Sequence, residues 1–275
     1  MIRRQWPPDK WLLIPQVEHS RVSGLIAASW NFSGSKPHRD LLHAISHHDD
    51  GWRAFDEEPS TNAAGAPVSF MEMAPEVSTM LWSGSIRSLE KDKKFYGARV
   101  VGQHFCELCK LNHDIKRTSA RGAAALGGFI GAQNFALRRY RATASQELHD
   151  SATVFEDSVD MPAIEPDPLE AFDTDVRFLQ VVDMISLLLC TEFTGETVIE
   201  NVPYLEGTDS LTVSRNGDGK LALKIDPLPF RRNLRDHVTG LVVPRKHYAV
   251  DDELREACAA AKPLVVEWHI GAISG

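Results

Sequence analysis

Apolar residues recur every three or four positions through most of the first 194 residues, which is the spacing that one face of an α-helix produces. The spacing predicts helices over Gln16–Trp30, Glu76–Leu89, Tyr96–Leu111, Ala120–Ala142 and Leu169–Thr191. A further helix is predicted to open near Pro37, which suits a first helical position, and to stop at Gly51. Most of this region is therefore expected to be helical.

Short alternating segments replace the helical spacing beyond Phe193-Thr194-Gly195. Apolar and polar residues alternate on both sides of Asn216-Gly217, a pair typical of tight turns, so a β-hairpin is predicted there. The predicted strands are Ser210–Ser214, Lys220–Ile225, Gly240–Pro244 and Pro263–Ile270, with a helix at Asp251–Ala261 before the last of them.

Two segments show neither the helical spacing nor the alternation that is typical of strands. Asp56–Val68 contains two prolines and a glycine and is predicted to be a loop, and the acidic, proline-containing segment Gln146–Asp167 is predicted to be a mobile connector. Taken together, the patterns predict a mainly α fold: a helical bundle over residues 1–194, with a small C-terminal antiparallel β extension over residues 195–275 that packs on it.

Composition narrows the expected partners. The formal net charge is −8 at pH 7, which repels phosphate backbones and anionic lipids, so we expect neither nucleic acid nor a membrane as a partner. No apolar run is long enough to cross a bilayer and the first residues lack the apolar stretch of a signal peptide, so we expect a cytoplasmic protein. A small phosphorylated substrate stays open, because a bound cation would reverse the local field.

Four cysteines are few for a chain of this length, which argues against a disulfide-stapled secreted protein. Cys106 and Cys109 form a CxxC pair, but no second pair accompanies it and the surrounding sequence predicts a buried helix. We interpret both as core thiols, with a zinc or redox role as the alternative.

Asp183 is the only charged residue between Phe178 and Cys190, in a strongly apolar predicted helix. Burying an uncompensated carboxylate is costly, so Asp183 needs a cationic partner. A metal ion would serve, but so would a buried salt bridge, or a helix edge that lets the carboxylate reach water.

Histidine and aspartate residues gather at the end of the second predicted helix, at His43, His47, His48, Asp49 and Asp50. These residue types bind borderline and hard divalent metals, and the adjacent His48 and Asp49 can reach one ion if the helix ends there. A solvated polar helix end is the alternative.

Two more histidines lie beside apolar positions of predicted helices. His19 is followed by Val22 and Leu25, and His104 shares a helix face with Val101 and Leu108. Each taken alone is more typical of a core or surface histidine than of a ligand.

The order His19, His48-Asp49 and Asp183 resembles the metal-ligand signature of the HD-domain superfamily of metal-dependent phosphohydrolases. In more detail, the chain resembles an uncharacterised bacterial family, the domain of unknown function 3891, and this likeness covers about Met1–Thr191. The segments that resemble it are Met1–Arg4, His19-Ser20, His48–Trp52 and Phe55–Pro59.

The resemblance implies an HD-domain-like helical bundle in which His19, His48, Asp49 and Asp183 hold a divalent transition metal: Mn, Fe, Co, Ni or Zn, as one or two ions. His104 resembles the extra histidine that binds a second ion or substrate phosphate. Additional ligands are expected at His47 and Asp50.

The implied activity is hydrolysis of a small phosphoester or nucleotide by a metal-activated water, with Asp49 and His104 as catalytic residues. The basic residues nearest to these in the sequence, which would neutralise the remaining phosphate charge, are Arg53, Arg99 and Lys110. Two alternatives stay open. One is a di-iron HD-type oxygenase with His43, His47, His104 and His113 as spare ligands. The other is a non-catalytic, metal-containing ligand-binding module with the β-rich tail as an interaction surface.

Overall fold

The computed structural model describes residues 1–273 except 35, 116–118, 155–170 and 216–219, and for 111–115 and 144–154 it describes the backbone alone. The α-helices are α1 (Gln16–Ser29), α2 (Arg39–His47), α3 (Arg53–Glu57), α4 (Pro75–Lys91), α5 (Phe95–Ile115), α6 (Ala120–Val154), α7 (Phe172–Cys190) and α8 (Asp251–Ala260). Single 3-10 turns are η1 (Asp50–Trp52) and η2 (Phe70–Glu72). The strands are β1 (Ile2–Trp6), β2 (Lys10–Ile14), β3 (Gly195–Ile199), β4 (Leu211–Arg215), β5 (Leu221–Asp226), β6 (Leu234–Pro244) and β7 (Pro263–Ala272).

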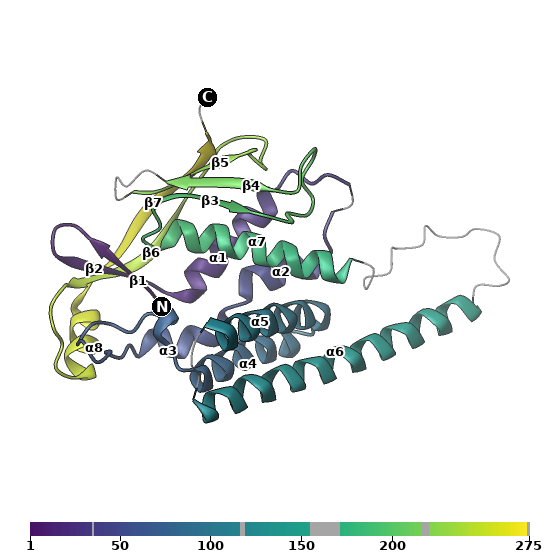
Figure 1. The fold of residues 1–275 in the computed structure, drawn as a ribbon, viewed down its shortest axis with the longest axis horizontal. Helices are drawn as coiled ribbons and strands as arrows, with labels where there is room; N and C mark the ends of the chain where they lie inside the picture. The colour runs from purple at the N-terminus through teal and green to yellow at the C-terminus, as the bar shows by residue number, and fades with distance from the viewer. Residues whose placement is uncertain (35, 116–118, 155–170, 216–219, 274–275) are drawn as a thin grey trace.

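One curled sheet contains all seven of these strands, in the order β1-β2-β6-β7-β5-β4-β3 (Figure 1). Neighbouring strands are antiparallel except β5 and β7, which are parallel. Strands from the two ends of the chain therefore share the sheet, because β2 pairs with β6, for example Leu12 with Val242. The expected domain boundary at residue 194 separates β1 and β2 from the strands with which they form this sheet.

The predicted fold class is wrong. About half of the chain is helical, and a seven-stranded mixed sheet replaces the expected mainly helical HD bundle with a small antiparallel extension. The prediction failed on β1 and β2, which are only five residues each. The inner part of β2, Leu12 to Ile14, is buried at three consecutive positions and shows no alternation. Such strands form because a distant partner pairs with them, which a local pattern does not reveal.

The helices form layers beneath the sheet (Figure 1). α1 and α7 pack against each other and against strands β6 and β5, α2 and α5 lie on their other side, and α4 and α6 complete the outer layer. The apolar core is continuous from the sheet through these helices, for example from Val238 through Ile26 to Val101. The region where α1, α2, α5 and α7 meet therefore lies inside this core and is shielded from water.

The other expected helices and strands are present, but α6 continues to Val154, past its predicted end at Ala142 and into the predicted connector, and β6 begins at Leu234 rather than at Gly240. The predicted loop Asp56–Val68 begins inside α3 and is closed by an isolated bridge between Thr61 and Pro67. Most of the predicted connector and the residues of the hairpin turn lie outside the described residues. Cys106 and Cys109 are buried, unpaired thiols whose pKa burial raises. Across the described part of the chain, no helix combines the length and hydrophobicity needed to cross a membrane.

Arg215 of β4 ties the sheet to the end of α7. Its buried guanidinium donates to the backbone oxygens of Thr191, at 2.8 Å, and of Leu189. It also donates to the backbone oxygen of Ala222 on β5, at 3.1 Å. A cation placed on carbonyls at a helix C-terminus satisfies acceptors that the helix itself leaves open and interacts favourably with the helix dipole.

We expect Arg215→Met to lower the free energy of unfolding by about 2–4 kcal/mol, because it leaves buried carbonyls without donors. Urea denaturation measures the change, and Arg235→Met, at an exposed position of β6, is the control with an expected change within about 0.5 kcal/mol. Equal stability losses in the two variants would show that the link to α7 contributes nothing.

Candidate metal centre

His19 is held in one orientation by two serines. It lies on α1 with its side chain 1% exposed, and its Nδ1 is hydrogen-bonded to the hydroxyl of Ser186 on α7. Ser186 can give its own proton to the backbone oxygen of Asp183, 3.2 Å away, so its oxygen accepts the Nδ1 proton. The hydroxyl of Ser23 lies 2.8 Å from that of Ser186. The Nε2 of His19 is therefore directed away from the serines and toward Asp183.

The end of α2 brings His48 and Asp49 to the same place. α2 ends at His47, and His48, which caps it, donates Nδ1–H to the backbone oxygen of Ile45 at 2.8 Å. Asp49 then takes a non-helical conformation before η1 begins. Because the chain leaves the helix between them, the two adjacent side chains reach the ring of His19 from one side. The Asp49 carboxylate lies 3.4 Å from His48 Nε2 and 3.7 Å from His19 Nε2.

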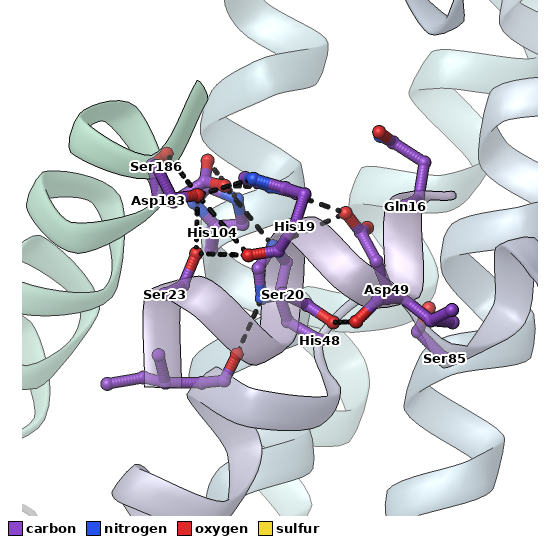
Figure 2. A network of polar contacts seen from close by, with 12 residues as sticks. Gln16, His19, Ser20, Ser23, His48, Asp49, Ser85, His104, Asp183 and Ser186 are labelled. Carbon is purple, nitrogen blue, oxygen red and sulfur yellow. Dashed lines mark hydrogen bonds and ion pairs between the residues drawn. The ribbon is translucent and has the colours of Figure 1, made fainter. Parts of the chain in front are cut away.

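Asp183 on α7 is the point on which three histidines converge (Figure 2). Its Oδ1 lies 2.8 Å from His19 Nε2 and 3.2 Å from His48 Nε2, and its Oδ2 lies 3.5 Å from Nε2 of His104 on α5. We call His19, His48, Asp49, His104 and Asp183 the Asp183 cluster. All five residues are buried. Four of them are the predicted ligands, so the structure brings together residues separated by up to 164 positions in the sequence (19 to 183).

Burial and charge shape the protonation states of this cluster in the absence of metal. Burial raises the pKa of Asp183, but hydrogen bonds from His19 and His48 outweigh that effect and hold it well below its usual value. Burial lowers the pKa of His48, but Asp49 and Asp183 more than compensate and raise it to about 9. Burial lowers the pKa of His104 to about 4, so its ring is neutral, and burial raises the pKa of Asp49. Without another cation, the cluster must therefore bind protons to balance its carboxylates.

The cluster fits a divalent metal ion. One ligand atom each from His19, His48 and Asp183 lie within 4.8 Å of one another, and Asp49 adjoins both imidazoles. His19 and His48 both have Nδ1 hydrogen-bonded and Nε2 turned inward, and a hydrogen bond to the outer ring nitrogen in this way orients an imidazole for metal binding. Two carboxylates and neutral imidazoles together offset the charge of one divalent cation, and this donor set suits Zn, Fe, Mn, Co or Ni.

A pocket of about 360 Å³ opens onto the Asp183 cluster. Apart from the cluster, its walls are mainly aromatic and aliphatic: Trp52, Phe70, Met71, Met73, Trp82, Phe105, Leu108 and Leu187. Gln16 and Ser78 add polar groups to the wall. The cluster is thus the polar floor of an apolar pocket, the arrangement expected of a site for a small molecule.

Three buried polar atoms of this pocket have no hydrogen-bond partner among the described residues. They are Oε1 of Gln16, Nε1 of Trp52 and Nδ1 of His104. A buried polar atom left unsatisfied costs about 1–3 kcal/mol, so such atoms seldom gather in one place without a reason. Gln16 and His19 are three residues apart on α1 and therefore face the same side, as Figure 2 also shows. All three atoms belong to residues that line the pocket, so their unmet hydrogen bonds lower the stability of its wall.

The remaining predicted residues lie away from the cluster. The side chain of His47 is 43% exposed and pairs with Asp50 at 2.9 Å, and neither residue lines the pocket. The predicted phosphate contacts are engaged elsewhere: Arg53 with Asp50, Arg99 with Glu90, and Lys110 with Glu107. His43 stacks on His47, 4.4 Å between ring centroids, and the His113 side chain lies outside the described residues.

The sequence interpretation missed four residues of the site, namely Gln16, Ser23, Trp52 and Ser186. Two of them carried a usable signal, because Ser186 follows Asp183 by three positions and Ser23 follows His19 by four, which places each serine on the same helix face as a ligand. Gln16 and Trp52 had no such signal.

A family model described as "Protein of unknown function (DUF3891)" matches residues 1–245 of the chain. The chain belongs to this family. No curated protein and no solved structure matches it. The family match spans the whole Asp183 cluster and β1 to β6 and ends before α8 and β7, so it reaches well past the expected limit at Thr191. A relation of this DUF3891 protein to the HD-domain superfamily stays a prediction.

Gly51 sets how closely η1 approaches α4 beside the cluster. A Cβ on Gly51 would lie 2.1 Å from the backbone oxygen of Leu81 and 2.5 Å from the backbone nitrogen of Ser85. The Gly51 amide also donates to the Ser85 hydroxyl at 3.0 Å. Gly51 was predicted to stop a helix, but α2 has already ended at His47, and a close approach of two backbones explains the glycine better.

We expect Gly51→Ala to lower the free energy of unfolding by about 1–3 kcal/mol, because η1 must move away from α4 to make room for the methyl group. Gly127→Ala is the matched control, since a Cβ at Gly127 on α6 meets nothing within 4 Å. The free energy of unfolding of that variant should instead rise by up to about 1 kcal/mol, because alanine has a higher helix propensity than glycine. Chemical denaturation of both variants distinguishes these outcomes.

Proposed function

We propose that this protein is a metal-dependent hydrolase that uses the Asp183 cluster to cleave a small phosphoester. The observation that carries the proposal is the pair of buried imidazoles, each with Nδ1 engaged and with Nε2 at 2.8 and 3.2 Å from one carboxylate oxygen, at the floor of a pocket. The order of the ligands along the chain, which resembles that of HD-domain phosphohydrolases, supports the same reaction class.

Within this proposal His19, His48, Asp49 and Asp183 hold the ion, and Ser186 and the Ile45 carbonyl keep the two imidazoles in their binding tautomers. A divalent ion here supplies Lewis acidity, which activates water and neutralises charge on the phosphoryl oxygens.

The protons in the reaction have candidate acceptors and donors in the cluster. Asp49 is the carboxylate suited to accept a proton from the attacking water, because burial raises its pKa. The neutral ring of His104 has an unpartnered Nδ1, as described above, which is available to a substrate oxygen. Hydrolysis adds the hydroxyl of water to phosphorus and its remaining proton to the leaving oxygen as the phosphorus–oxygen bond breaks.

The two alternative functions have less support. A di-iron oxygenase needs more ligands, and of the spare histidines whose side chains are described only His104 reaches the cluster. A non-catalytic module would bind metal without turning over any phosphoester. We further propose a cytoplasmic location, which the four unpaired cysteines support.

Purified protein is expected to retain one or two divalent transition-metal ions, and His48→Ala and Asp183→Ala should each lose most of them. Mass spectrometry of bound metals measures the content. His237→Ala, in which an exposed histidine on β6 is replaced, is the control and should keep the metal. Wild-type protein that is purified without chelators, contains no metal and then fails to bind Mn, Fe, Co or Zn would contradict the proposal.

We expect metal binding to cancel the loss of stability at rising pH that His48 causes in the metal-free protein. In metal-free protein the pKa of His48 is raised from 6.5 to about 9, so its stabilising contribution is complete below pH 6.5 and is lost as the pH rises through about 9. A metal ion requires the unprotonated ring, so the stabilisation that it adds should grow over the same interval.

Denaturation curves with EDTA and with saturating Mn²⁺ across this interval measure both trends. The added stabilisation is the difference between the two curves at each pH. If it stays constant or shrinks as the pH rises toward about 9, His48 does not bind the metal through its ring nitrogen.

A further inference from the structure

The pocket above the Asp183 cluster presents flat apolar surfaces to whatever it holds. Trp82 on α4 and Phe105 on α5 stack with 5.1 Å between ring centroids and 13° between planes, and both line the pocket. Phe70 and Met73 line it from η2 and the residues after it, and Met71, 63% exposed, also belongs to its lining. A substrate that reaches the cluster must therefore lie against aromatic and thioether groups.

The charge of the lining side chains and the volume of the pocket also indicate a small substrate with few phosphate groups. Among the described side chains that line this pocket, none belongs to lysine or arginine, and the three predicted phosphate contacts are paired with acids elsewhere. At about 360 Å³ the pocket lies near the lower end of the range for small-molecule sites, roughly 300–1,000 Å³. A substrate with several phosphates would find little counter-charge here beyond a bound metal ion.

We infer that the substrate has one anionic head, which reacts at the Asp183 cluster, and a flat apolar body of aromatic character that packs against the walls formed by Phe70, Trp82 and Phe105. This inference rests on the proposed function, because it takes the cluster as the place of reaction. A pocket of this kind should bind aryl phosphoesters more tightly than nucleotides that contain several phosphates.

A series of phosphonates tests the inference without turnover, because their phosphorus–carbon bond is not an ester. Methylphosphonate, phenylphosphonate and 1-naphthylphosphonate have the same head and an increasing flat apolar body. Binding to the Mn²⁺-loaded full chain is measured by calorimetry and by quenching of tryptophan fluorescence, which reports on Trp52 and Trp82 in the wall. EDTA-treated protein shows how much of the binding needs metal.

We expect 1-naphthylphosphonate to bind at least about tenfold more tightly than methylphosphonate, since it buries more apolar surface. Phe70→Ala should remove most of this preference, so that the affinities for 1-naphthylphosphonate and methylphosphonate become similar. Phe135→Ala is the matched control, because Phe135 is 62% exposed on α6 and does not line this pocket. Met71→Ala, a change at an exposed side chain that leaves the core intact, should reduce the preference in the same direction.

The outcomes separate the inference from the proposed function. Equal affinity for the methyl and naphthyl compounds, or a naphthyl preference that Phe70→Ala and Met71→Ala leave intact, would overturn the aromatic substrate and leave the hydrolase standing. If metal-loaded protein binds no phosphonate of the series, both proposals fall. Metal-dependent binding that strengthens with the apolar body and weakens in the two wall variants supports both.

Discussion

The electrostatic constraint on this structure is the burial of two carboxylates, those of Asp49 and Asp183, at one point between helices. Carboxylates away from water must be balanced by positive charge, whether from protonated histidines or from a metal ion. The geometry around Asp183 allows both, because the same Nε2 atoms that face a metal also face the carboxylate when no metal is bound. In the metal-free state the protein uses protons where the holo state would use an ion, so metal binding and proton release are coupled here.

Close packing of the helices holds the side chains of the Asp183 cluster in their relative positions. A Cβ on Gly24 of α1 would lie 2.0 Å from the Ser46 hydroxyl of α2, and one on Gly97 of α5 would lie 2.6 Å from the Cβ of Ala44. The helices that supply the ligands can approach this closely only because glycine has no side chain. The sheet holds the opposite side of the same helices, through contacts of α1 with β6 and of α7 with β5. The sheet, which is mixed and larger than the predicted β extension, thus supports the two helices that position His19 and Asp183.

Family membership and site geometry answer different questions. The DUF3891 match groups the chain with proteins whose function is not described, and it includes every residue of the Asp183 cluster. The geometry adds a pocket, buried donor atoms and an apolar wall, which are the grounds for the proposed hydrolase and for its aromatic substrate. Because Phe70, Trp82 and Phe105 of the wall come from elements other than those that carry the proposed metal ligands, metal binding and substrate choice could change separately in this fold.

The sequence alone predicted the helices and singled out four residues of the Asp183 cluster, because helical spacing is local and because an acid such as Asp183 inside an apolar helix has few explanations. The sequence alone could not show the whole sheet, since β1 and β2 are short, β1 pairs with β2, and β2 pairs with β6, which lies more than two hundred residues away. Only the tertiary structure showed that Ser186 orients His19, that Arg53 is paired elsewhere, and that Trp52 lines the pocket. Each of these facts is a distance between segments remote in sequence, and such distances are set by packing rather than by local pattern.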